Sequence, residues 1–110
     1  MTVTTSKVTE LVAKICKEEG GEPNTTKDVF KGISDNVKVD VVVCKIPKDN
    51  KEVTFFITDK SLSATAVTIE PSGVKKQLTY TADLESAKRK IPDAIEEFVK
   101  VFIRDVLEGK

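Results

Sequence analysis

The feature that most constrains this fold is the stretch from residue 37 to residue 81, where apolar and polar side chains largely alternate. A period of two is typical of a β-strand, because successive side chains point to opposite faces of the sheet. Short turns at residues 47–51 and 71–73 help divide the stretch into four segments. Parallel neighbours would need crossover connections of a dozen or more residues. The stretch therefore predicts an antiparallel meander of four strands, over residues 37–44, 53–58, 62–70 and 74–81.

An amphipathic helix is predicted on each side of this meander. From Val8 to Cys16, apolar residues recur at the spacing of one helix face, and the glycine pair at 20–21 ends the pattern. Over residues 91–108, a helical wheel gathers the apolar side chains within an arc of about 140°. We expect Pro92 in the first turn of that helix, preceded by a shorter helical piece over residues 84–90 that Asp83 caps.

The segment between the first helix and the first strand of the meander carries the weakest signal. The Pro-Asn pair at 23–24 indicates a loop. Residues 28–33 favour a short edge strand over a helical turn, because Gly32 disfavours a helix. The expected fold is one α+β domain over residues 1–110, with an N-terminal helix, a four- or five-stranded antiparallel meander and a C-terminal helix kinked or split at Pro92. Both helices are expected on one sheet face.

The composition argues against the familiar classes of enzyme. The chain has no histidine, so it lacks the side chain best suited to proton transfer near neutral pH and the commonest metal ligand. Its glycines form no phosphate-binding pattern. Asp40 interrupts a run of valines, and the alternation predicts that it faces solvent beside Lys38. We expect a protein that is not an enzyme and that holds no metal or cofactor.

Two cysteines, Cys16 and Cys44, are expected on different elements. Their spacing matches neither a zinc site nor a thioredoxin-like motif. Both lie among apolar neighbours, which favours buried free thiols, and a disulfide is the alternative.

The source and the cellular location follow from composition as well. Asn, Gln, Cys and Met are scarce beside abundant Lys and Glu, which is typical of hyperthermophile proteins. Residues 1–7 contain no apolar run of the kind found in signal peptides, and no apolar stretch of the sequence approaches 18 residues. We expect a cytoplasmic protein from a thermophile that does not enter a membrane.

The strand phase, by which we mean the assignment of alternate side chains to the two faces of the sheet, predicts which side chains are exposed. If residues 53, 55 and 57 face the helices, several apolar side chains remain on the opposite face among threonines, and Val42 and Cys44 are provisionally assigned to that face too. Exposed apolar groups of this kind usually mark an interface. The leading hypothesis is a small interaction module that self-associates as a homodimer and binds a macromolecular partner. The candidate interface residues are Phe56, Val67 and Ile69 on the sheet, and Val101 and Leu107 on the last helix.

The alternative is a protein that binds single-stranded nucleic acid. In this hypothesis an aromatic side chain stacks on a base and basic side chains contact phosphates. Two observations count against it: 18 basic and 18 acidic residues cancel, and Tyr80 is expected on the sheet face opposite the candidate stacking residue. The residues concerned are Phe56, Lys75, Lys76, Lys88, Arg89 and Lys90.

Overall fold

The computed structural model describes residues 5–31, 36–84 and 91–109, and the side chains of residues 5–27, 38–84 and 92–109. Its five strands form one antiparallel sheet in the order β1-β2-β3-β4-β5, so the predicted meander and the α+β fold are confirmed. The elements are α1 (Thr5–Glu18), β1 (Glu22–Lys31), β2 (Asn36–Ile46), a short 3-10 helix (Pro47–Asp49), β3 (Lys51–Ile57), β4 (Ser61–Ile69), β5 (Lys75–Asp83) and α2 (Ile91–Glu108).

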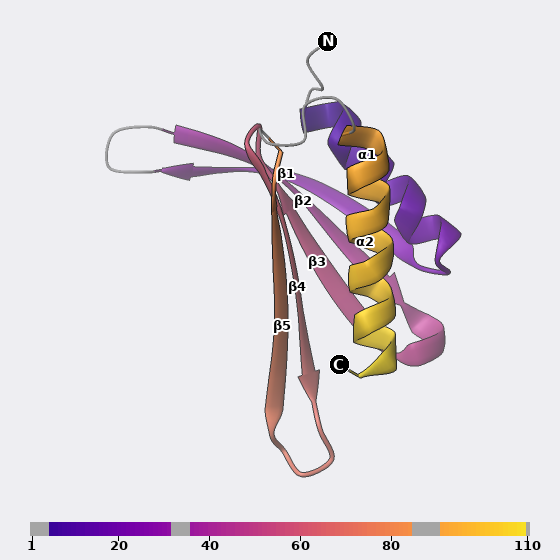
Figure 1. Ribbon diagram of the computed structural model, residues 1–110. Helices are drawn as coiled ribbons and strands as arrows, with labels where there is room; N and C mark the ends of the chain where they lie inside the picture. Colours follow the sequence, from indigo (N-terminus) through magenta and orange to yellow (C-terminus); the bar gives the residue numbers. More distant parts are fainter. Residues whose placement is uncertain (1–4, 32–35, 85–90, 110) are drawn as a thin grey trace.

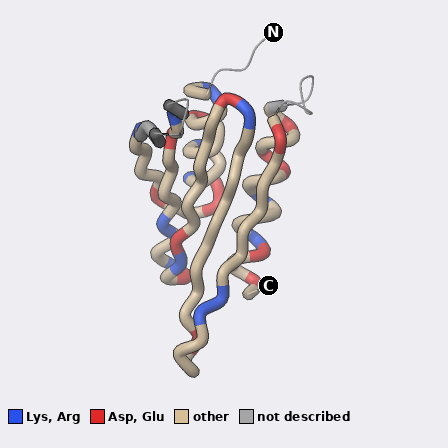
Figure 2. Tube along the Cα trace, turned by 90° about the vertical axis from the view of Figure 1, so that its left-hand side faces the viewer, with Lys and Arg blue, Asp and Glu red and all other residues tan. Residues whose placement is uncertain are grey.

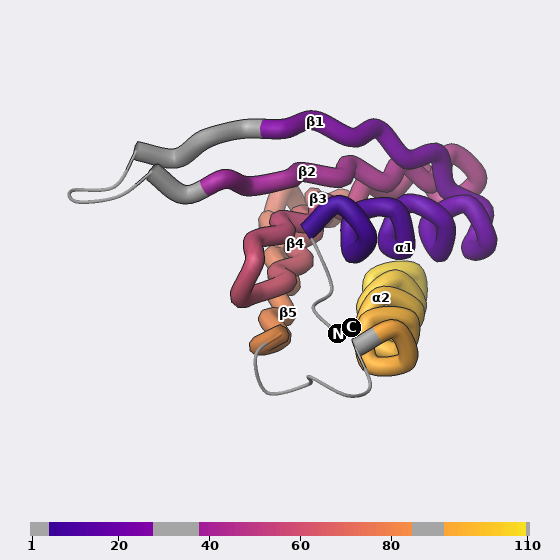
Figure 3. The backbone as a smooth tube through the Cα atoms, turned by 90° about the horizontal axis from the view of Figure 1, so that it is seen from above, coloured from indigo at the N-terminus to yellow at the C-terminus, as the bar shows by residue number. Residues whose placement is uncertain are grey.

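Both helices lie on the same side of the sheet (Figures 1 and 3). Helix α1 packs mainly on β1 and β2, α2 packs on β3, β4 and β5, and the two helices contact each other. We call the sheet face under the helices the covered face and the other one the open face. This arrangement is the one that the two amphipathic helix patterns predict.

The core fills the space between the helices and the covered face. In β3 the burial alternates, with Val53, Phe55 and Ile57 fully buried, as the strand phase predicts. From α2, the Phe102 ring meets Phe55 edge-on, with 6.1 Å between the ring centroids. The other members of this buried cluster are Val8, Val12, Ile15, Cys16, Val42, Cys44, Ile46, Leu62, Ala64, Ala66, Leu84, Ile95, Val99, Ile103 and Val106.

Strand β1 begins earlier than the sequence indicates. The predicted loop at residues 23–24 is wrong, because Pro23 lies in β1, opposite Cys44 of β2. A proline is tolerated there because β1 is an edge strand and needs hydrogen bonds on one side only. The strand predicted at residues 28–33 is confirmed over residues 28–31, and the rest of that segment lies outside the described residues.

Helix α2 begins as predicted, with Pro92 in its first turn. The shorter helical piece predicted over residues 84–90 lies outside the described residues except for Leu84. That residue is buried in a turn directly after β5, and its backbone N–H donates to the carbonyl oxygen of Lys60 over 2.9 Å. Asp83, which was predicted to cap that piece, is the last residue of β5.

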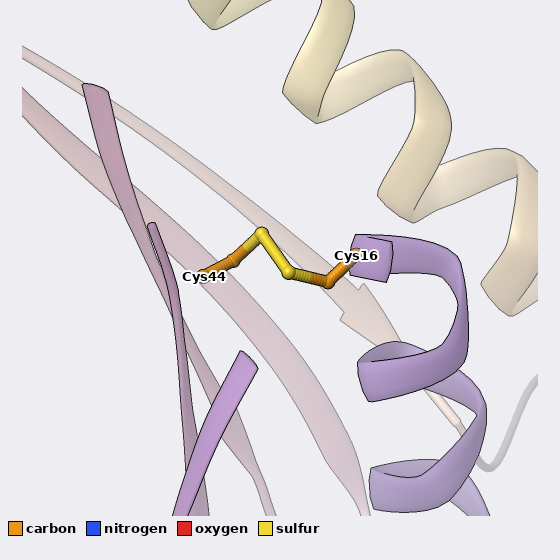
Figure 4. Close-up of a disulfide and its surroundings, with 2 residues drawn as sticks. All are labelled: Cys16 and Cys44. Atoms are coloured by element: carbon orange, nitrogen blue, oxygen red, sulfur yellow. A yellow bond between two sulfur atoms is a disulfide. The ribbon is translucent and has the colours of Figure 1, made fainter. Parts of the chain in front are cut away.

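The two cysteines form a disulfide, so the prediction of free thiols is wrong while the prediction of burial is confirmed. Cys16 lies in the last turns of α1 and Cys44 lies on the covered face of β2, with their Cα atoms 6.0 Å apart (Figure 4). The register explains this meeting, because Cys44 pairs with the buried Val53 and so faces the helices. The provisional placement of Cys44 and Val42 on the opposite face is therefore also wrong.

Gly21 is needed because the disulfide passes directly above it. A Cβ atom at this position would lie 2.6 Å from Sγ of Cys44 and 2.8 Å from Sγ of Cys16, closer than side chains approach. Gly20 ends α1 with a positive φ of 87°, as its place in the sequence predicts. The two neighbouring glycines thus serve different purposes, one conformational and one steric.

Asp40 is buried, so its predicted exposure to solvent is wrong. It shares the helix-facing phase of Val42 and Cys44, and its side chain lies near the start of α1 with 8% of its surface exposed. The Thr9 hydroxyl lies 2.9 Å from Asp40 Oδ2 and 2.8 Å from the Thr5 carbonyl oxygen, so its single proton serves one of two acceptors. A buried carboxyl group is tolerated here because it has a hydrogen-bond partner.

Candidate interaction surface

Three strands build the centre of the open face. The register places Phe56 of β3 beside Ser63 of β4, and Ser63 beside Thr81 of β5. The next row joins three threonines, Thr54, Thr65 and Thr79. The open face is therefore hydroxyl-rich at its centre, as the strand phase predicts.

The hydroxyl groups of this face bond to one another across the strands. The oxygens of Thr65 and Thr79 lie 3.1 Å apart, and those of Ser63 and Thr81 lie 3.4 Å apart. The Gln77 amide donates to the Thr65 hydroxyl over 3.4 Å. Cross-strand contacts of this kind hold neighbouring strands in register.

The centre of the open face carries no charge. Strand β4 has no charged residue along its whole length, and neither β3 from Val53 onward nor β5 from Gln77 to Ala82 has one. Figure 2 shows the same pattern, with the long central strands free of charged positions over most of their length. Lys75 and Glu70 lie at the hairpin end of this surface, beyond its uncharged centre.

The end of the β4–β5 hairpin projects beyond the rest of the sheet (Figure 1). Pairing of β4 with β3 ends at Ala66, whereas pairing with β5 continues to Ile69 opposite Lys75. We call residues 67–77 the projecting hairpin. Its turn is closed by the Gly73 N–H, which donates to the Glu70 carbonyl oxygen over 2.8 Å.

The projecting hairpin concentrates exposed apolar side chains. Val67, Ile69 and Val74 are 56%, 66% and 55% exposed, and among the described residues the other large apolar side chain of comparable exposure is Val101, at 42%. Val67 and Ile69 share the open face with Phe56, which is half-buried. Neighbouring exposed apolar side chains on one face, such as Val67 and Ile69, mark an interaction site more often than scattered single residues do.

A groove runs beside this hairpin, between it and the turn that joins β2 to β3. Its volume is about 770 Å³, and Val67 and Ile69 line it on the hairpin side. Ile46 and Val106 contribute apolar surface deeper in, while charged residues such as Lys51 lie along its rim. The groove extends the apolar patch of the hairpin towards the end of α2.

The residues predicted for the last helix lie on another side of the molecule. Val101 is exposed, but Leu107 is half-buried and packs against the core. Because α2 packs on the covered face, the sheet separates Val101 from the open face (Figure 3). The structure therefore groups Phe56, Val67 and Ile69 on one face and leaves the two helix residues apart from them.

The residues of the nucleic-acid hypothesis are not grouped in the described part of the chain. Lys75 and Lys76 are both exposed, and Lys76 pairs with Glu70 over 3.4 Å. The register neighbours of Phe56 are Val41 and Ser63, which carry no charge. Lys88, Arg89 and Lys90 lie outside the described residues. The binding of single-stranded nucleic acid stays a prediction.

Tyr80 lies on the covered face, opposite to Phe56, as predicted. Its ring meets Phe102 edge-on at 5.0 Å between centroids, and its hydroxyl donates to Asp105 Oδ2 over 2.5 Å. This hydrogen bond, together with some desolvation and the carboxylate charge, raises the pKa of the Tyr80 hydroxyl above 10.0. Tyr80 therefore ties the β5 edge of the sheet to α2.

Val74 is the exposed residue of the projecting hairpin that sequence analysis missed. It follows a turn, and a single valine there carries no periodic signal. Its exposure depends on β4 and β5 running past the end of β3, which is a property of strand lengths in the assembled sheet.

The fold and the surface define a class: a two-layer α+β protein with one sheet face under helices and one face open. Within the described residues, no three His, Cys, Asp or Glu side chains gather where a metal ion would bind. No helix in that part of the chain is both long and apolar enough to cross a membrane. Comparison with protein-family models, curated proteins and solved structures finds no match to this chain.

Proposed function

We propose that this protein is a small non-enzymatic interaction module that self-associates as a homodimer and binds a partner protein through its open face. The observation that carries the proposal is the exposure of Val67, Ile69 and Val74 together on the projecting hairpin. Isolated apolar side chains are common on surfaces, but Val67 and Ile69 lie two residues apart on the same face of one strand, and both line the adjoining groove.

The absence of charge at the centre of the open face favours a protein partner over a nucleic acid. Phosphate contacts supply most of the affinity of nucleic-acid binders, and they require Lys or Arg. Strand β4, which occupies the middle of this surface, has none. An uncharged, threonine-rich face with an apolar end suits an apolar segment of another protein better.

The proposal includes a cytoplasmic location and a thermophilic source. A buried disulfide is compatible with both, since intracellular proteins of hyperthermophiles are often rich in disulfides.

Self-association is tested by sedimentation equilibrium at tens of micromolar protein. We expect twice the mass of one chain, and a monomeric mass over the whole concentration range would contradict a homodimer. A labelled single-stranded oligonucleotide added at low salt should leave the sedimentation unchanged. A shift that added salt removes would support the nucleic-acid alternative instead.

Partner binding is tested by selecting peptides from a random displayed library on the native protein. The selected peptides should be rich in aliphatic and aromatic residues. Val67→Thr combined with Ile69→Thr should weaken their binding about tenfold, because the first change replaces a methyl group with a hydroxyl and the second replaces an ethyl group with a hydroxyl.

The matched control for this selection is Val101→Thr, which alters the exposed valine of α2 and should leave peptide affinity unchanged. Peptides that bind the double variant as tightly as the native protein would overturn the assignment of the patch.

A further inference from the structure

Strand β5 is an edge of the sheet whose charged residues, Lys75, Lys76 and Asp83, lie at its two ends, so that in the described part of the chain the middle of the strand lacks the usual protection of edges. It pairs with β4 on one side, and no other described strand lies on its other side. From Gln77 to Ala82 it contains neither proline nor a charged residue. The opposite edge, β1, carries Pro23 and Lys27, which are typical of edges that avoid pairing. An unprotected edge strand is a template for one more strand.

The side chains of β5 are arranged so that the strand complements a reversed copy of itself. On the open face it presents Lys75, Gln77, Thr79, Thr81 and Asp83 in this order. An antiparallel copy centred on Thr79 would place each Lys75 opposite Asp83 of the second copy. This register gives two pairs of opposite charge at the ends and uncharged contacts between them.

The covered side of β5 is complementary in the same register. Leu78 and Tyr80 face the helices there and are only partly buried, although both pack against the core. The register that is centred on Thr79 places Leu78 of each copy opposite Tyr80 of the other copy, which gives two such pairs. An aromatic–aliphatic pair across two strands is favourable, and it would complete the burial of both side chains.

We infer that two copies of this chain pair antiparallel through β5, centred on Thr79, and form one continuous ten-stranded sheet. The inference rests on the self-association proposed above and specifies its surface. It leaves Val67 and Ile69 of each copy, which lie on β4, outside the β5 contact and available to the partner protein. The two-fold symmetry makes the contact isologous, the commonest form of homodimer.

The first experiment is a cross-link at the symmetry centre. The two cysteines of the chain are joined in the buried disulfide, so Thr79→Cys introduces one reactive thiol. In the proposed register the two Cβ atoms lie roughly 5 Å apart, within reach of a short bismaleimide. We expect efficient covalent dimers.

The matched control for the cross-link is Thr65→Cys, on the same face but one strand further in. Its two copies would lie roughly 14 Å apart, three strand spacings, and should give little product with the same short reagent.

The second experiment exchanges the charges at the ends of the strand. Lys75→Asp places two carboxylates opposite each other and should weaken the dimer about tenfold, because two attractive pairs become repulsive. Adding Asp83→Lys to the same chain restores opposite charges across the contact and should recover the affinity.

The outcomes separate this inference from the proposed function. A dimeric protein that gives no Thr79→Cys cross-link and is unaffected by Lys75→Asp would overturn the β5 contact and leave self-association standing. A monomeric native protein would overturn self-association, and the β5 contact with it. Recovery of the dimer by the charge exchange would support both.

Discussion

The two faces of the sheet differ in almost every physical respect, although the same strands build them. Phe55 and Phe56 are neighbours in the chain, yet one is fully buried under α2 and the other is half-buried on the open face. The covered face holds the core and the disulfide, whereas the open face holds Ser and Thr hydroxyl groups that bond to one another across the strands. This difference teaches that the interactions that stabilise the fold are concentrated on the covered face, so the open face is available for contacts with other molecules.

The sharpest test of this contrast compares Phe55→Ala with Phe56→Ala. Removing the Phe55 ring leaves a cavity against Phe102 and should cost about 3–5 kcal/mol of unfolding free energy. Removing the half-buried Phe56 ring should cost about 1 kcal/mol, since less apolar surface returns to water and no closed cavity forms. Urea denaturation of both variants gives the two values, and equal losses would show that the faces do not differ as described.

The disulfide of the covered face should have the next largest effect. It closes a loop across a sequence separation of 28 residues. Cys16→Ala together with Cys44→Ala should lower the unfolding free energy by about 3–4 kcal/mol, because the unfolded chain regains conformational freedom. Thermal unfolding with and without a reductant makes the same comparison on the native protein, and two titratable thiols in the native protein would contradict the bond.

Gly21 provides a control for the disulfide geometry. Gly21→Ala should destabilise the disulfide-bonded protein, because the new methyl group meets both sulfur atoms. The same change should cost less in the Cys16→Ala, Cys44→Ala background, where the sulfur atoms are gone. An equal cost in both backgrounds would show that the sulfur atoms do not restrict this position.

A smaller effect is expected from the buried polar pair on the covered face. Asp40→Ala should cost about 1–3 kcal/mol, since the Thr9 hydroxyl loses an acceptor and a small cavity remains. Asp49→Ala, in the exposed turn after β2, should change the unfolding free energy by no more than about 0.5 kcal/mol. A double-mutant cycle with Thr9→Val isolates the contribution of the pair, and zero coupling would contradict the contact.

The smallest effect concerns pH at the rim of the covered face. The Tyr80 hydroxyl should titrate above 10.0, and Asp105→Asn should lower this pKa towards its ordinary value. The chain has one tyrosine and no tryptophan, so tyrosinate absorbance reports this residue directly. Because the folded-state pKa is raised, the stabilisation is fully present below pH 10 and is lost as the pH rises through the folded-state pKa. If the pKa of Tyr80 were the same in Asp105→Asn as in the native protein, the hydrogen bond would not be the cause of the raised pKa.

Much of the fold was predictable because periodicity is a local property. The alternation of Val53, Phe55 and Ile57 and the helical spacing from Val8 to Cys16 identified both the elements and the faces that are buried. The same rule placed Val67 and Ile69 on the open face, where they are exposed. Asp40 was misplaced because its strand is apolar on both faces, so alternation alone does not say which face the helices cover.

The sequence by itself determined most of the elements, their antiparallel order and the absence of histidine, because these depend on residue type and short-range spacing. Only the tertiary structure decided that Cys16 bonds to Cys44, that Asp40 lies under α1, and that the β4–β5 hairpin extends beyond the end of β3. Each of these depends on register between segments that are distant in the chain. Register is settled by the packing of a whole helix on a whole sheet, and no local pattern encodes it.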